Sequence, residues 1–168
     1  MAGFPSVKPA FTVKVIAAPP LSVGSAHRKT SLTVVPMTGG TITPEPGFSP
    51  ALDAEFVGTG NDYIHVDPDN GRMRLDAHGV VKTKDDALIY LNYKGTVNLT
   101  PEVQSIFAGK AGDLTTPFGD VFTYFTFETG DDRYKALENG VFVAQGRFVN
   151  VSGKPLVVEY RVGQVVQG

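Results

Sequence analysis

Ionisable and apolar residues alternate along the segment from Arg72 to Val80. Arg72, Arg74, Asp76 and His78 occupy every second position, and Met73, Leu75, Ala77 and Gly79 lie between them. Such alternation is typical of a β-strand, whose side chains point to opposite faces in turn. The pattern predicts a strand with one wholly polar face. Carboxylate, imidazole and guanidinium groups on one face can move protons and hold an oxyanion or a carboxylate.

Three later segments repeat this alternation and add aromatic side chains to the polar ones. The residues that share a face are Leu88, Tyr90 and Asn92; Phe122, Tyr124, Thr126 and Glu128; and Val157, Glu159 and Arg161. The other face of Arg72 to Val80 would make a thin core layer, so we expect the polar face to line the inside of a barrel. Charges buried there must pair with one another or with water. A polar face turned to solvent, common in antiparallel sheets, is the competing interpretation.

The elements that position these side chains are short strands separated by glycine and proline. The chain has 168 residues with 19 Gly and 12 Pro, and turn residues at this density favour an all-β protein. The expected strands are Phe11–Ile16, Ser31–Val35, Ala51–Val57, Tyr63–Val66, Arg72–Lys82, Ala87–Lys94, Phe118–Phe127, Gly140–Val149 and Leu156–Val166. About eight strands are enough to close a small barrel. We predict one domain over residues 1–168, a closed antiparallel β-barrel of the calycin or lipocalin kind.

Turns and short helices connect the expected strands. Asn70-Gly71 predicts a type I′ hairpin, and Lys84-Asp85-Asp86 a second hairpin. The three prolines of Thr41–Pro50 predict a loop or irregular edge. Thr100 before Pro101 predicts a helix ending near Gly109, and Thr129–Asn139 predicts another short helix.

Composition and motifs exclude several classes of function. The chain has no Cys and a net charge of -2, which disfavours disulfides, thiolate metal sites and nucleic-acid binding. His27, His65 and His78 lack the spacing of a metal site, and the Gly pairs lack the residues of a phosphate loop. We therefore expect no metal, no cofactor and no membrane segment. With no signal-like apolar run in Met1–Ala18, the expected location is cytoplasmic.

A set of motifs, in order and spacing, resembles the family defined by domain of unknown function 3237. The motifs are Gly39-Gly40, Gly58-Thr59-Gly60-Asn61-Asp62-Tyr63, Leu75-Asp76-Ala77-His78, Asp85-Asp86-Ala87-Leu88-Ile89-Tyr90 and Phe127-Glu128-Thr129-Gly130-Asp131-Asp132-Arg133-Tyr134. The likeness runs from about Val23 to Val162. It implies a closed barrel of an uncharacterised small β-barrel family, with members of fungal or bacterial specialised-metabolism type. Family members that occur among specialised-metabolite genes look like candidates for cofactor-free isomerases or cyclases.

Particular positions match or depart from the pattern of this family. Asp62 matches its acidic residue after the paired glycines, whereas Tyr63 stands where Trp is usual and Asn61 where Ala is usual. His78 and Phe122 stand where Arg is expected. If both line the lumen, these two changes favour a pocket for a large hydrophobic ligand.

The resulting functional hypothesis is a cofactor-independent isomerase or cyclase that acts on an apolar, oxygenated metabolite in the lumen. Asp62, Asp76 and Glu128 are the candidate acids or bases. Residues expected to bind the substrate are Arg74, His78, Tyr90, Tyr124, Phe122, Glu159 and Arg161. The alternative is a lipocalin-like carrier that holds a small molecule without reacting with it. A third option is a structural subunit that uses an outer barrel face to form a homo-oligomer such as a dimer.

Overall fold

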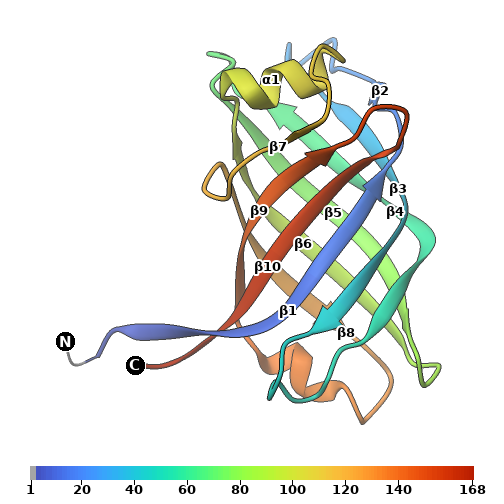
Figure 1. Ribbon diagram of the computed structural model, residues 1–168, viewed down its shortest axis with the longest axis vertical. Coiled ribbons are helices and arrows are strands. Elements are labelled where there is room, and N and C mark those ends of the chain that lie inside the picture. The colour runs from blue at the N-terminus through green and yellow to red at the C-terminus, as the bar shows by residue number, and fades with distance from the viewer. Residues whose placement is uncertain (1–2) are drawn as a thin grey trace.

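Eight long strands form a closed antiparallel barrel in the computed structural model, which describes residues 3–168 (Figure 1). The strands are β1 (Pro5–Ala17), β2 (Leu21–Ser22), β3 (Thr33–Pro44), β4 (Ala54–Val66), β5 (Arg72–Thr83), β6 (Leu88–Asn98), β7 (Leu114–Thr115), β8 (Val121–Glu128), β9 (Phe142–Asn150) and β10 (Leu156–Gln167). They pair in the order β1-β10-β9-β8-β6-β5-β4-β3, and pairing of β3 with β1 closes the barrel. The two-residue strands β2 and β7 lie outside this closed path. The predicted all-β barrel is confirmed.

β3 and β4 each continue through a segment where the sequence indicated a break. Ala51–Val57 and Tyr63–Val66 belong to one strand, β4, which carries a bulge between Phe56 and Gly60. β3 continues through Pro36 to Pro44, so the loop predicted from Thr41 onward begins too early. Pro36 is tolerated because the pairing of β3 with β4 shifts directly after it.

The first hairpin forms with a different turn from the one predicted. Asn70 has a positive φ of 57°, but Gly71 does not share the left-handed conformation that a type I′ turn requires. Instead, the Asn70 N–H donates to the Asp67 carbonyl, and the Asp67 N–H donates to the Arg72 carbonyl. The second hairpin is also present, with a positive φ at Asp86.

One of the two predicted helices forms as expected. α1 (Pro101–Phe107) begins after Thr100, whose hydroxyl accepts the Val103 N–H, and Gly109 follows its end in the left-handed region. In contrast, Thr129–Asn139 forms only the 3-10 helix η1 (Lys135–Asn139). The Asp131 carboxylate accepts the Arg133 N–H, and this local turn replaces the first helical turn. None of the described helices is long and apolar enough to cross a membrane.

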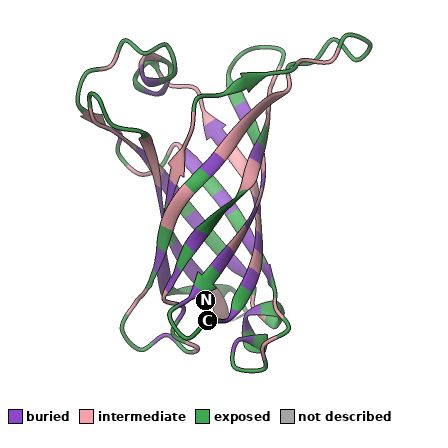
Figure 2. Cartoon of the chain, turned by 90° about the vertical axis from the view of Figure 1, so that its right-hand side faces the viewer, coloured by how far each residue is buried: buried purple, intermediate pink, exposed green. Residues whose placement is uncertain are grey.

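The apolar faces of the eight long strands form the buried core in the lumen. Figure 2 shows buried residues alternating with more exposed ones along the strands. On β5, Met73, Leu75, Ala77 and Val81 are buried, and Arg72, Arg74, Asp76 and His78 lie on the outer face. The prediction that the polar face lines the lumen is therefore wrong. The thin face of β5 suffices because bulky side chains from other strands fill the space beside it. A Cβ at Gly79 would lie 3.1 Å from Met37 Cε and 3.2 Å from a Phe56 ring carbon.

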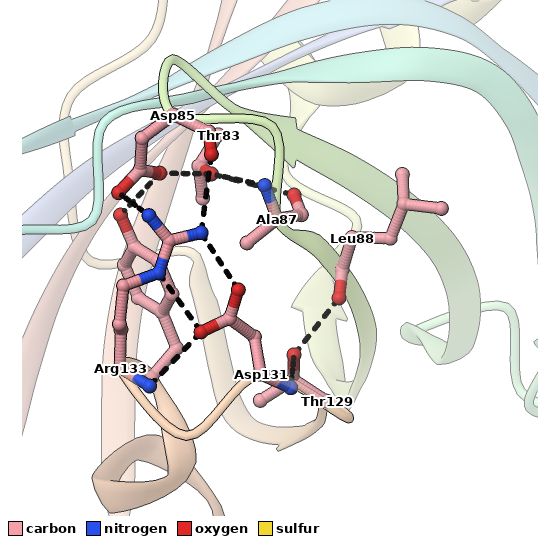
Figure 3. A network of polar contacts seen from close by, with 8 residues as sticks. Thr83, Asp85, Ala87, Leu88, Thr129, Asp131 and Arg133 are labelled. Atoms are coloured by element: carbon pink, nitrogen blue, oxygen red, sulfur yellow. Dashed lines mark hydrogen bonds and ion pairs between the residues drawn. The ribbon is translucent and has the colours of Figure 1, made fainter.

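The η1 end of the barrel is held closed by a network of charged and hydroxyl groups (Figure 3). Arg133 bridges Asp85 and Asp131, with both ion pairs at 2.7 Å. The Tyr134 hydroxyl donates to Asp85 at 2.9 Å, and the Thr83 hydroxyl donates to the same carboxylate. Hydrogen bonds from Arg133 lower the pKa of Asp131 to about 2. The network ties the β5–β6 hairpin to the segment that follows β8.

The two ends of the chain leave the barrel together as a two-stranded ribbon (Figure 1). β1 pairs with β10 from Pro5 onward, but it pairs with β3 only from Phe11. β10 in turn pairs with β9 only as far as Gln164. The ribbon, Pro5–Pro9 with Gly163–Gln167, is therefore not part of the closed wall.

Candidate functional site

Asp62 is a carboxylate on the inward face of β4. It lies opposite Ala77 of β5, a fully buried residue, and its own exposed fraction is 8%. The Asp76 backbone N–H donates to Asp62 Oδ1 at 3.1 Å. The preceding bulge uses glycine where the backbone requires it: Gly58 has a φ of 75°, and a Cβ at Gly60 would lie 2.3 Å from the His78 carbonyl. The paired glycines thus let β4 lie close against β5 next to Asp62.

Burial gives this carboxyl group an unusual acidity. Removal from water raises the pKa of Asp62 from 3.8 to about 7; the Asp76 N–H acts in the opposite direction, and the negative charge of Asp76 raises it further. No cation is among the groups that set this pKa. At neutral pH both the acid and the base form of Asp62 are therefore populated, which is the property that a general acid or base needs.

Two buried tyrosines lie near Asp62 in the lumen. Tyr93 of β6 and Tyr160 of β10 are each 2% exposed, and their ring centroids are 5.2 Å apart. Burial raises the pKa of both phenols, and the Asp62 carboxylate adds to this effect in each case. Both hydroxyls thus stay protonated and can donate hydrogen bonds. Phe125 packs against both rings, so the lumen at this level is filled by side chains.

Asp62 lies nearer to the α1 end of the barrel than to the η1 end, where β4 begins. The inward-facing apolar side chains of β4 and β10 toward the α1 end are only partly buried, whereas Met73 and Leu75 of β5 are buried. The partly buried side chains are Ile64 and Val66 of β4 with Leu156 and Val158 of β10. We call these four residues the mouth. α1 covers another part of this end through Val103 and Ile106. Asp62 thus lies on the inner side of the mouth, away from the end of the barrel.

Asp76, His78 and Tyr90 were predicted to act in the lumen, but the structure joins them on the outer wall. His78 Nε2 lies 2.9 Å from Asp76 Oδ1, and His78 Nδ1 lies 2.6 Å from the Tyr90 hydroxyl. Lys94 and Asn92 also contact the Asp76 carboxylate, at 3.0 Å each. Hydrogen bonds from these two residues help to lower the pKa of Asp76, although partial burial opposes them as the largest single influence. The arrangement is a solvent-facing chain of paired charges.

Four other predicted site residues also lie outside. Arg74 forms a bidentate pair with Asp67, and Phe122 and Tyr124 are about half exposed. Glu128 lines an open outer groove together with Tyr90, Leu88 and Glu138. With His78 and Phe122 outside, their departures from the family pattern change the outer surface, and the expectation of a lumen made more apolar by them is wrong.

Glu159 and Arg161 form a charged cluster on the outer side of β10. Glu159 is 5% exposed because charged side chains surround it. The Glu159 carboxylate contacts Arg147 at 3.1 Å, Arg161 at 3.5 Å and Lys14 at 3.9 Å. The Arg147 guanidinium also stacks on Phe118, 4.7 Å from the ring centre. Paired in this way on the outer wall, neither Glu159 nor Arg161 can touch a ligand in the lumen.

No group of three or more His, Asp or Glu side chains suited to a metal ion occurs within residues 3–168. Of the ten residues predicted for the site, Asp62 alone lies in the lumen. Tyr93 and Tyr160 were not predicted. Asp62 lies in phase with Ile64 and Val66, and Tyr93 with Ile89, Leu91 and Val97. A polar residue in phase with core residues was the signal that could have found all three.

The model of a protein family of unknown function, DUF3237, matches residues 5–165. The chain belongs to the DUF3237 family. Solved structures with the same fold include a conserved protein of unknown function from Rhodopseudomonas palustris, with 21% identity, a TM-score of 0.78 and coverage of 98% of this chain and 100% of that one. A β-barrel-like protein from Acinetobacter baumannii has 24% identity, a TM-score of 0.72 and coverage of 98% of both chains.

A more distant structure is that of an enzyme from Penicillium herquei, with 18% identity, a TM-score of 0.58 and coverage of 94% of both chains. No curated protein matches the chain. At these identities the solved structures show the fold alone. The DUF3237 motifs serve two purposes in this barrel: Asp85 and Phe127–Tyr134 build the closed η1 end, and Gly58–Asp62 places the lumenal carboxylate.

Proposed function

We propose that the protein is a cofactor-independent isomerase or cyclase that uses Asp62 as general acid and base. The observation that carries the proposal is a buried carboxyl group with a pKa of about 7 on the inner side of the apolar mouth. The substrate would be a small, largely apolar molecule that carries oxygen. Its apolar part would lie on Ile64, Val66, Leu156 and Val158, with the reacting atoms over Asp62.

The chemistry at this site needs no oxidant, reductant or second substrate. The ionised Asp62 accepts a proton from one atom of the bound molecule, and the protonated Asp62 returns a proton to another atom of the same molecule. The formula of the molecule is unchanged, and the bond order or ring closure is altered. An uncharged substrate suits the site, because a negative charge would lie near the Asp62 carboxylate with no cation to offset it.

The proposal is tested by presenting the protein with apolar phenols, ketones and unsaturated alcohols. Molecules that bind at the mouth are found from NMR shifts of Ile64, Val66, Leu156 and Val158. Each binder is then incubated in D₂O and examined by mass spectrometry and chiral chromatography. Product of unchanged formula, or deuterium exchanged into carbon, supports the proposal when Asp62→Asn abolishes it and Asp76→Asn does not. Binders recovered unchanged and undeuterated would instead favour the carrier function.

A further inference from the structure

An apolar stripe crosses the outer wall over four neighbouring strands. Tyr124 of β8 pairs with Val143 of β9. The Val141 carbonyl, beside the start of β9, accepts the Val165 N–H of β10. Val165 pairs in turn with Val7 of β1. The stripe therefore runs without interruption from the barrel wall onto the terminal ribbon.

The stripe exposes more apolar surface than scattered surface residues do. Its large side chains are 37–61% exposed: Val7, Phe122, Tyr124, Val141 and Val143. A large side chain exposes about 150–250 Å² in full, so together these five present roughly 450 Å². A patch of this size matches the largest apolar patches on monomeric soluble proteins, which are often functional. It is more than half of the ~800 Å² that each partner buries in an interface of standard size.

The ribbon adds unpaired backbone groups to this surface. β1 has no second neighbour before Ala10, and β10 has none beyond Gln164 except the single bond to Val141. Because the ribbon projects from the barrel (Figure 1), no other part of the described chain covers it. Open strand edges with exposed apolar side chains are normally covered or blocked in soluble proteins.

We propose that a second copy of this chain covers the stripe in an isologous dimer. The ribbon of each copy lies across the β8–β9 face of the other, so that Val7 packs against Phe122 and Tyr124 of the partner subunit. One patch carries both a projecting element and a face for it to cover, which is what a two-fold interface requires. The stripe side chains are uncharged, so two identical faces meet without repulsion. The mouth lies elsewhere, at the α1 end, and stays open in the dimer.

The first test is the molar mass in solution, measured by light scattering and sedimentation velocity from about 1 to 100 μM. The dimer predicts twice the 17.9 kDa of the chain. Val7→Asp and Tyr124→Asp should each weaken dimerisation at least about 30-fold, because each buries a charge in an apolar interface. Leu88→Asp is the matched control: Leu88 is 58% exposed, as Val7 is, but lies outside the stripe. A monomeric wild type, or stripe variants as dimeric as Leu88→Asp, would overturn the proposal.

An engineered disulfide tests how the two copies meet. Because the chain has no Cys, only the introduced cysteines can form it. Within one chain β9 and β10 separate Val7 from Tyr124, and three strand spacings of ~4.8 Å exceed the ~7 Å limit of a disulfide. Oxidised Val7→Cys/Tyr124→Cys should therefore form covalent dimers with high yield, and each single variant controls for random oxidation. A wild-type dimer whose double variant forms no more covalent dimer than the single variants would contradict this arrangement.

Discussion

Asp62 and Asp76 lie on neighbouring strands, and a hydrogen bond joins the backbone of one to the side chain of the other, yet they face opposite sides of the wall. Inside, Asp62 has no cation and its pKa rises to about 7. Outside, Asp76 contacts His78, Lys94 and Asn92, and its pKa falls below the usual value. The same type of carboxyl group thus titrates near neutral pH or forms a paired surface ion according to the face that carries it.

The comparison shows that the number of polar contacts is a poor guide to a reactive site. The outer cluster is rich in ion pairs, but solvent-exposed pairs of this kind contribute little energy and hold their charges fixed. The lumenal carboxyl group has few polar partners, and its proton is therefore available at neutral pH. A functional role is therefore better supported for Asp62 than for the larger cluster.

The largest expected effect separates the two carboxylates by activity. Once a substrate is identified, Asp62→Asn should lower kcat/KM at least about 100-fold, because the amide cannot exchange a proton. Asp76→Asn should change it less than about threefold. Steady-state kinetics of both variants measures the contrast. Equal losses in the two variants would mean that the face of the wall does not decide the chemistry.

The second expected effect is on stability as a function of pH. The pKa of Asp62 is higher in the folded than in the unfolded state. The folded state therefore becomes less stable relative to the unfolded state as pH rises from about 4 to about 7, because Asp62 ionises more easily in the unfolded chain. Asp62→Asn keeps an acceptor for the Asp76 N–H and removes this loss of stability. Its free energy of unfolding should exceed that of wild type by up to about 4 kcal/mol at pH 8 and by little at pH 4.

Urea titrations at several pH values measure this difference. Asp76→Asn should show the opposite trend: the lowered pKa stabilises the wild type above about pH 4, and this advantage disappears in acid. A difference between wild type and Asp62→Asn that is the same at pH 4 and pH 8 would show that Asp62 does not hold a proton through folding.

A smaller effect is expected from Thr123, on the inward face of β8. Its hydroxyl is buried without a hydrogen-bond partner in the described chain. Thr123→Val keeps the shape and removes the unpaired group, so it should raise the free energy of unfolding by about 1 kcal/mol. Chemical denaturation gives the value. A loss of stability in this variant would show that the hydroxyl is satisfied inside the lumen.

The smallest effect is expected on the outer wall. His78→Ala breaks the contacts to Asp76 and Tyr90, but these groups remain open to water. It should change the free energy of unfolding by less than about 1 kcal/mol. Thermal melts of His78→Ala beside wild type provide the check. A destabilisation of several kcal/mol would mean that the outer cluster is a structural centre.

Sequence predicted the barrel well because alternation and turn residues are local signals. The helix after Thr100 and the hairpin after Val66 follow from side-chain caps and turn chemistry. The prediction of a helix over Thr129–Asn139 was wrong because Asp131 and Arg133 form a turn, and Arg133 of this turn pairs with Asp85, which is distant in sequence. Local propensity cannot anticipate such a contact.

Which face of a strand points into the lumen could not be predicted from the alternation along that strand alone. Arg72 to Val80 offers a thin apolar face, and Met37 and Phe56 from β3 and β4 complete the core around Gly79. Such filling depends on which strands meet, which alternation does not reveal. Asp62 was found through the family motif, and Tyr93 and Tyr160 were missed because the expected lumenal faces of β6 and β10 were the polar ones.

Titration of the Asp62 carboxyl carbon by ¹³C NMR tests the central claim most directly. Selective labelling of aspartate, with Asp62→Asn to assign the signal, gives its midpoint beside that of Asp76. The structure predicts a midpoint near pH 7 for Asp62 and one below the ordinary value of an aspartate for Asp76. A midpoint for Asp62 near pH 4 would contradict the account of a buried, unpaired acid on the inner side of the mouth.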